Sequence, residues 1–269
     1  MKPSQLNNTL HTFQYKQTPL HYQDIGKGKP ILLIHGFLEN HSMWENIIKQ
    51  LAPTCRCISP DLFGHGNSPA LGYIHEMKTY AGALAQLMQH LQIKEFIVIG
   101  HSMGGYVAME LLQLHPNMIT DLILLNSTPL DDSPEKKENR ERAIRAIQKF
   151  PDAFVQMAVR NLFLMEDQLR LQKEIKHTVN EAQKCSHQAI VATLKGLKER
   201  TNHQETFVKA KCNKLVIAGK RDQIAPFEKL KEAIQGSKAK LLSFKGGHMS
   251  HLEFPEEVNL ALSNFLKLN

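Results

Sequence analysis

The sequence predicts an α/β fold in which helices cover both faces of a mostly parallel sheet. Three observations predict it. Short apolar runs alternate with longer helical patterns along the 269 residues. The runs are continuously apolar rather than alternating, which is typical of parallel strands buried on both faces. The composition, 42% hydrophobic and 22% charged, is that of a folded chain, and its length fits one or two domains.

The expected elements follow in order. Residues 12–16 and 20–25 flank the turn Gln17-Thr18-Pro19 and predict an opening hairpin. Pro116 is placed to end the third of the expected helices, because its ring cannot continue one. The later strands are predicted at 31–34, 55–59, 96–99, 122–125, 215–218 and 241–244, and the helices near 42–51, 76–92, 103–115, 226–235 and 255–267.

The interval 131–205 interrupts this rhythm, since it contains no convincing strand. It opens on the turn signal Asp131-Asp132-Ser133-Pro134, continues as a charged helical stretch and then becomes more apolar. We interpret it as a helical insertion, a cap over the carboxyl edge of a core formed by residues 1–130 and 206–269. An ordinary pair of surface helices is the alternative, but it explains the large apolar side chains less easily.

Several functional classes are disfavoured. The net charge of +7 is spread out without a long basic run, so no nucleic-acid partner is expected. No apolar stretch is long enough for a membrane span, and the opening MKPSQLNNTLH lacks the apolar core of a signal peptide. The four cysteines are too few for a disulfide scaffold, and Cys55 and Cys57 have no second pair to complete a zinc site. We expect a cytoplasmic monomer or homodimer that acts on a small molecule.

The motif Gly100-His101-Ser102-Met103-Gly104 carries the sharpest functional signal. It matches G-x-S-x-G between a predicted strand and a predicted helix. Glycines two residues before and after the centre remove Cβ atoms that would clash across such a sharp turn. The turn would present the Ser102 hydroxyl above the sheet edge, and Gly105 would let the helix pack close to the sheet. Ser102 is therefore the candidate nucleophile.

A serine nucleophile needs a base, and the base needs an acid to orient it. His248 follows a predicted strand in a glycine-containing loop and is the preferred base, with His251 as its competitor. Asp222 follows the strand before that one and is the preferred acid. Asp131 and Asp132 remain possible acids, because they also follow a strand.

Backbone N–H groups would stabilise the negative charge that develops on the substrate oxygen. The Met103 N–H stands at a helix N-terminus, and Gly36 lets the chain turn so that the Phe37 N–H can face the same point. We interpret His35, His65 and His101 as structural residues. Among the 14 histidines there is no H-E-x-x-H or comparable cluster, so we expect no metal and no cofactor.

These motifs resemble the α/β-hydrolase fold superfamily over nearly the whole chain. The resemblance rests on the order Ser, Asp, His and on the segments His35-Gly36-Phe37, Asp61-Leu62-Phe63-Gly64-His65-Gly66-Asn67-Ser68, Gly100–Gly105, Gly247-His248 and His251-Leu252-Glu253-Phe254-Pro255-Glu256. It implies an eight-stranded, mostly parallel sheet with a cap inserted after the sixth strand. Dehalogenases and epoxide hydrolases of this fold carry Asp at the nucleophile position, so Ser102 argues against both.

The expected function is a carboxylesterase-like serine hydrolase that forms an acyl-enzyme on a small or medium, largely apolar ester. Apolar side chains of the cap and of the first loop would line its pocket: Leu38, Phe150, Phe154, Met157, Phe163 and Met165. A C–C bond hydrolase acting next to a ketone is an alternative, with Arg140, Arg142, Arg145 or Arg160 as possible substrate anchors. A ligand-sensing protein of the same fold is another.

Overall fold

A computed structural model describes residues 9–268. Most of the opening segment, in which we expect no signal peptide, lies outside this range. The described chain forms one eight-stranded sheet in the order β1-β2-β4-β3-β5-β6-β7-β8. The strands are β1 (Leu10–Tyr15), β2 (Thr18–Gly26), β3 (Lys29–Ile34), β4 (Cys55–Pro60), β5 (Phe96–His101), β6 (Ile119–Leu125), β7 (Asn213–Gly219) and β8 (Lys240–Phe244).

The six strands from β4 to β8 in this order pair in parallel, and β2 is antiparallel to both its neighbours. The predicted mostly parallel fold is confirmed. The hairpin turn differs in detail from the prediction. It consists of Lys16 and Gln17, both with positive φ, and Thr18 and Pro19 already belong to β2. Two successive left-handed residues suit a two-residue hairpin, because their twist matches that of the flanking strands.

Successive residues of the central strands point to opposite faces of the sheet, which explains the continuous apolar runs. On one face, Leu32 and Ile34 pack in a cluster with residues of α2 (Met77–His90), α3 (Met103–Leu114), α8 (Gln204–Lys209) and α9 (Phe227–Ala233). On the other, Ile31 and Leu33 pack with α1 (Glu45–Leu51) and α11 (Pro255–Leu266). Two short helices, η1 (His41–Trp44) and η2 (Pro116–Met118), precede α1 and β6.

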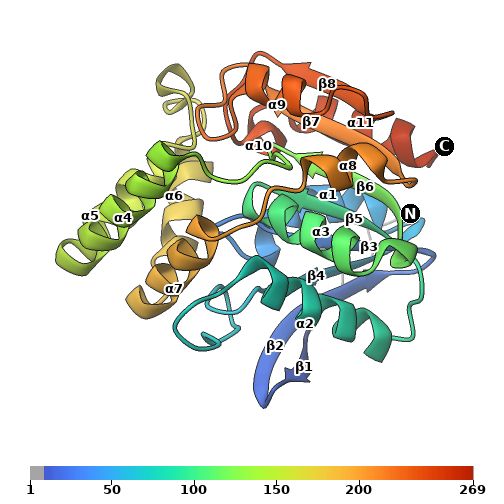
Figure 1. Ribbon diagram of the computed structural model, residues 1–269, viewed down its shortest axis with the longest axis horizontal. Helices are drawn as coiled ribbons and strands as arrows, with labels where there is room; N and C mark the ends of the chain where they lie inside the picture. Colours follow the sequence, from blue (N-terminus) through green and yellow to red (C-terminus); the bar gives the residue numbers. More distant parts are fainter. Residues whose placement is uncertain (1–8, 269) are drawn as a thin grey trace.

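Between β6 and α8, residues 134–198 are largely helical and lie to one side of the sheet (Figure 1). The helices are α4 (Pro134–Lys149), α5 (Pro151–Arg160), η3 (Met165–Asp167), α6 (Gln172–Ala182) and α7 (His187–Lys198). They share an apolar cluster with Leu38 and Met249, which follow β3 and stand shortly after β8. The helical segment therefore faces the edge at which the parallel strands end. The expected boundary at residue 205 falls inside α8, whose Phe207 packs in the core cluster with α3.

No described helix is both long and apolar enough to cross a lipid bilayer.

Candidate active site

Ser102 occupies a strained turn between β5 and α3. Its φ of 49° and ψ of −114° lie outside the regions that ordinary side chains adopt. The two flanking glycines avoid two different clashes, one within the turn, as expected, and one with the end of β3. A Cβ on Gly100 would lie 2.4 Å from the Gly104 carbonyl oxygen, and one on Gly104 would lie 2.0 Å from the Ile34 carbonyl oxygen. The turn holds Ser102, 9% exposed, at the carboxyl edge of the sheet.

The two residues expected to activate Ser102 come from the next loops along this edge. Asp222 follows β7, and His248 follows β8 in the loop before α10 (Ser250–Glu253). The His248 Nε2 atom lies 2.8 Å from the Ser102 Oγ atom, and its Nδ1 atom lies 2.8 Å from the Asp222 Oδ2 atom. His248 and Asp222 are 2% and 4% exposed. The three side chains therefore form one continuous hydrogen-bonded chain shielded from water.

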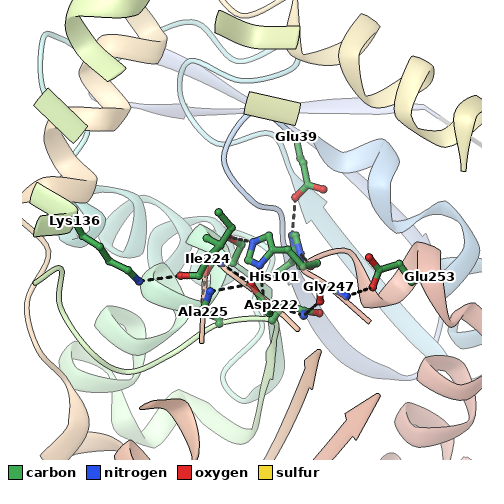
Figure 2. Close-up of polar contacts among 12 residues, drawn as sticks. Glu39, His101, Lys136, Asp222, Ile224, Ala225, Gly247 and Glu253 are labelled. Carbon is green, nitrogen blue, oxygen red and sulfur yellow. Dashed lines mark hydrogen bonds and ion pairs between the residues drawn. The ribbon is translucent and has the colours of Figure 1, made fainter. Parts of the chain in front are cut away.

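Asp222 is surrounded entirely by hydrogen-bond donors. Its Oδ1 atom accepts from the backbone N–H groups of Ile224 and Ala225, as Figure 2 shows, while Oδ2 accepts from the side chains of His248 and Asn126. Burial alone would raise the pKa of this carboxyl, but the attraction of His248 and these hydrogen bonds outweigh burial and lower it. Asp222 is thus held as a carboxylate, which orients the Nδ1–H of His248.

The alternative base and acids are engaged elsewhere. His251 lies between the rings of His101 and Trp44, with ring centroids at 5.0 and 6.4 Å. The buried Asp132 carboxylate forms ion pairs with Arg140 and Arg200, and Asp131 accepts from the Asn202 side chain. The structure therefore brings His248 and Asp222, and not their competitors, to Ser102.

The expected oxyanion donors lie on the two segments that meet beside Ser102. Residues 36–39 form a turn closed by the Glu39 N–H and the Gly36 carbonyl, which leaves the Phe37 N–H out of the turn hydrogen bond. Leu38, the third residue, has a φ of 64°, as a type II turn requires. The close approach of Gly104 to the Ile34 and His35 carbonyls brings the α3 N-terminus, with Met103, next to this turn.

Gly36 has a different role from the expected one. Its φ is not left-handed, but a Cβ there would lie 2.3 Å from the Glu39 Oε2 atom and 2.8 Å from the His101 Nδ1 atom. The glycine is needed because a buried ion pair occupies that space.

This ion pair, Glu39 with His101, was missed in the sequence. The Glu39 Oε2 atom accepts from the Gly36 N–H at 2.8 Å and from His101 Nδ1 at 2.7 Å, a contact visible in Figure 2. His101 Nε2 donates to the His248 carbonyl at 3.1 Å. Both ring nitrogens face acceptors, so His101 is an imidazolium. Burial opposes both charges, yet their attraction lowers the pKa of Glu39 to about 2 and raises that of His101.

The other two histidines of the motifs have structural contacts. His35 Nε2 accepts from the Leu62 N–H, and its Nδ1 donates to the Gly36 carbonyl, so both nitrogens are used in holding the loop. His65 is buried beside the His35 ring, and burial lowers its pKa to about 3. These contacts match the structural interpretation of both.

Glu253 supports the loop that carries His248. Its Oε2 atom accepts from the Gly247 N–H at 2.7 Å, as Figure 2 shows. The carboxyl is 4% exposed, and burial raises its pKa to about 7. From the helical segment, the Leu162 carbonyl accepts from the His248 N–H at 3.3 Å. The base is therefore held from the core and from the helical segment together.

The six expected pocket residues fall into two groups. Leu38, Phe154 and Phe163 are buried in the cluster that also contains Met249, next to His248. The other three are largely exposed and lie outside the buried part of this cluster: Phe150 is 67%, Met157 53% and Met165 86% exposed. Because α5 turns positions 154, 155 and 159 inward, position 157 falls on its outer side, while Phe150 stands at the non-helical junction between α4 and α5. The prediction that these three side chains line the pocket is therefore wrong.

Residues 9–268 contain no group of three or more side chains arranged to hold a metal ion.

A mostly parallel sheet with a serine, a histidine and an aspartate hydrogen-bonded at its carboxyl edge is typical of hydrolases, and comparison with known proteins gives the same family. A family model of the alpha/beta hydrolase fold matches residues 29–255. The chain therefore belongs to this family of hydrolases. It is 28% identical to AB hydrolase superfamily protein YisY of Bacillus subtilis, over 91% of this chain and 94% of that protein.

Two further proteins are similar to this chain, one over almost its whole length and one over a shorter segment. A thermophilic esterase from Thermogutta terrifontis superposes with a TM-score of 0.87 at 27% identity, over 96% of this chain and 98% of that one. An uncharacterized protein of Mycobacterium tuberculosis is 36% identical over 102 residues, which are 38% of this chain. The match spans only 30% of that protein's length.

Proposed function

We propose that the protein is a serine hydrolase that cleaves small or medium, largely apolar esters through an acyl-enzyme. One observation carries the proposal: a buried hydrogen-bonded chain joins Asp222, His248 and Ser102, with both contacts of His248 at 2.8 Å. That arrangement is what a serine hydroxyl needs to become a nucleophile. The likeness to the Thermogutta terrifontis esterase supports the same reaction.

In the proposed reaction, Ser102 Oγ attacks the ester carbonyl carbon while its proton passes to His248 Nε2. The Phe37 and Met103 N–H groups stabilise the negative charge on the carbonyl oxygen. His248 then protonates the leaving alcohol as the tetrahedral intermediate collapses to the acyl-enzyme. A water molecule, deprotonated by His248, attacks the acyl carbon, and release of the acid restores Ser102. Asp222 keeps the Nδ1–H of His248 oriented and stabilises the imidazolium.

The proposed substrate is apolar because the side chains around the site are apolar. Leu38, Phe154 and Phe163 belong to one cluster with Met249, and Phe37 packs against it. We propose that the helical segment acts as a cap, and that these residues line the pocket beneath it. The contact between the Leu162 carbonyl and the His248 N–H supports this role.

Cleavage of a C–C bond next to a ketone, with the same triad, is less well supported. Such a reaction calls for a basic anchor for the substrate carboxylate. Arg140 is bound to Asp132, and Arg142 to Glu138. Arg145 and Arg160 are exposed at the surface. None of the four is thus a free cation directed at Ser102.

The test combines labelling with turnover. A fluorophosphonate should modify the folded protein at Ser102 and leave the Ser102→Ala variant unlabelled. A series of 4-nitrophenyl esters from acetate to decanoate, beside a vinylogous 1,5-diketone, should show turnover of the esters alone. Ser102→Ala should lower kcat by about 10⁴-fold or more. An unlabelled wild-type chain, or an unchanged rate in Ser102→Ala, would contradict the assignment. If no substrate is turned over but a small ligand binds tightly, the result would favour the ligand-sensing protein of the same fold.

A further inference from the structure

A cavity of about 290 Å³ lies beside the active site. It is formed between the segment from Leu38 to Asn46, the helix α6 and the residues His251 and Leu252. Ser102, Asp222 and His248 do not line it. The cavity is therefore separate from the proposed reaction centre, although its inner end reaches Glu39, the last residue of the turn 36–39.

Three buried polar atoms at the inner end of this cavity have no hydrogen-bond partner among residues 9–268. They are the Oε1 atom of Glu39 and both ring nitrogens of His251. Both side chains line the cavity, and each is 4% exposed. Buried polar atoms in folded proteins are nearly always hydrogen-bonded, since leaving one unpaired destabilises the fold. Three such atoms together, on two side chains at one cavity, indicate that a polar ligand binds there.

The chemistry of these atoms selects the ligand. Glu39 is ionised, so its Oε1 atom accepts hydrogen bonds and favours a charged donor. Burial lowers the pKa of His251 to about 3, so its ring is neutral and offers one donor and one acceptor. A hydroxyl group can donate to the accepting ring nitrogen or accept from the donating one, and thus suits one side of the imidazole. An ammonium group matches the carboxylate.

The walls of the cavity favour a cation over a neutral molecule. Four carboxylates line it, against the single ammonium group of Lys173: Glu39, Glu45, Glu174 and Glu181. Glu39 forms an ion pair with His101. Glu181 forms an ion pair with Lys184 and accepts a hydrogen bond from the Asn40 side chain. Glu45 has only a long, exposed contact with Lys49 at 3.8 Å, which contributes little. Glu45 and Glu174 thus leave negative charge towards the mouth, while Leu38, Met43 and Leu252 offer an apolar side.

We propose that this cavity binds a small ammonium compound that also carries a hydroxyl group. The ammonium group donates to the Glu39 Oε1 atom. The hydroxyl group pairs with one of the free nitrogens of His251. The carbon atoms between them lie against Leu38 and Met43.

Ethanolammonium is the probe, and ethylene glycol is its neutral match of the same size. The protein is labelled with ¹³C at its methionine methyl groups, because Met43 lines the cavity whereas Met103 and Met249 adjoin Ser102 and His248. Signals are assigned with single Met→Leu variants. We expect ethanolammonium to shift the Met43 signal saturably, with ethylene glycol binding at least about tenfold more weakly.

Charge variants then test the walls. Glu174→Gln should weaken ethanolammonium binding about fivefold, because it removes the negative charge of one carboxylate that lines the cavity. Glu232→Gln, an exposed position on α9, is the matched control and should change nothing. The proposal is overturned if Met43 does not respond, if ethylene glycol binds equally well, or if the Met103 and Met249 signals shift instead. Binding requires no turnover, so this outcome is independent of the fate of the proposed hydrolytic reaction.

Discussion

Replacing Asp222 by Asn tests the logic of the site most directly, because the variant keeps the shape and changes only which atoms accept. All four groups around this carboxylate are donors: two backbone N–H groups on one oxygen, and the side chains of His248 and Asn126 on the other. An asparagine has one accepting oxygen and one donating NH₂ group. Its oxygen can satisfy the two backbone groups, and the NH₂ group must then face His248.

The imidazole must respond to that change. An NH₂ group opposite Nδ1 favours the tautomer in which Nδ1 accepts and Nε2 carries the proton. Nε2, 2.8 Å from the Ser102 Oγ atom, could then no longer take the serine proton. We expect kcat to fall about 10⁴-fold, which corresponds to about 5 kcal/mol in the activation free energy. The remaining contact between the NH₂ groups of residues 222 and 126 should destabilise the fold by about 1–3 kcal/mol.

The assay is hydrolysis of a 4-nitrophenyl ester, followed together with the rate of fluorophosphonate labelling and the thermal unfolding midpoint. Asp131→Asn is the matched control, because this exposed residue also follows a strand and its side chain is hydrogen-bonded to Asn202, away from the triad. It should keep the wild-type rate. A folded Asp222→Asn variant that retains more than a tenth of the wild-type rate would refute the reasoning.

Three further predictions concern stability. Gly104→Ala would place a Cβ 2.0 Å from the Ile34 carbonyl oxygen and should lower the free energy of unfolding, measured in urea, by about 3 kcal/mol or more. Gly82→Ala is the control: its Cβ would meet its nearest atom at 3.6 Å, so the variant should be as stable as the wild type or slightly more stable. The pKa of Glu39 is lowered to about 2, so its ionisation stabilises the folded state fully above the unfolded pKa of about 4.3, and this stabilisation is lost as the pH falls towards 2. Glu39→Gln should therefore reduce the dependence of the unfolding free energy on pH in that range. An unchanged pH dependence in the variant would refute the ion pair. The pKa of Glu253 is raised to about 7, so the stability of the folded state falls as the pH rises from about 4.3 to 7. Glu253→Gln should remove this decline in the unfolding midpoint. A decline of wild-type size in the variant would contradict the assignment.

The sequence by itself determined where the strands lie along the chain and the turn at Ser102. Both depend on local pattern. Continuous apolar runs mark strands covered on both faces. Gly100 leaves space within the turn itself, since a Cβ there would meet the Gly104 carbonyl, whereas Gly104 is needed because a Cβ there would meet the Ile34 carbonyl at the end of β3. The family to which the chain belongs was recognised from the same motifs.

Only the tertiary structure decided which groups meet. His248 and His251 stand three residues apart in similar surroundings, yet one contacts Ser102 and the other lines a cavity. The pairing of Glu39 with His101, across 62 positions, has no local signal because the fold alone brings the β3 turn against the end of β5. The same holds for the pocket. An apolar side chain at 154 or 157 looks alike in the sequence, and the orientation of α5 against its neighbours determines which one is buried.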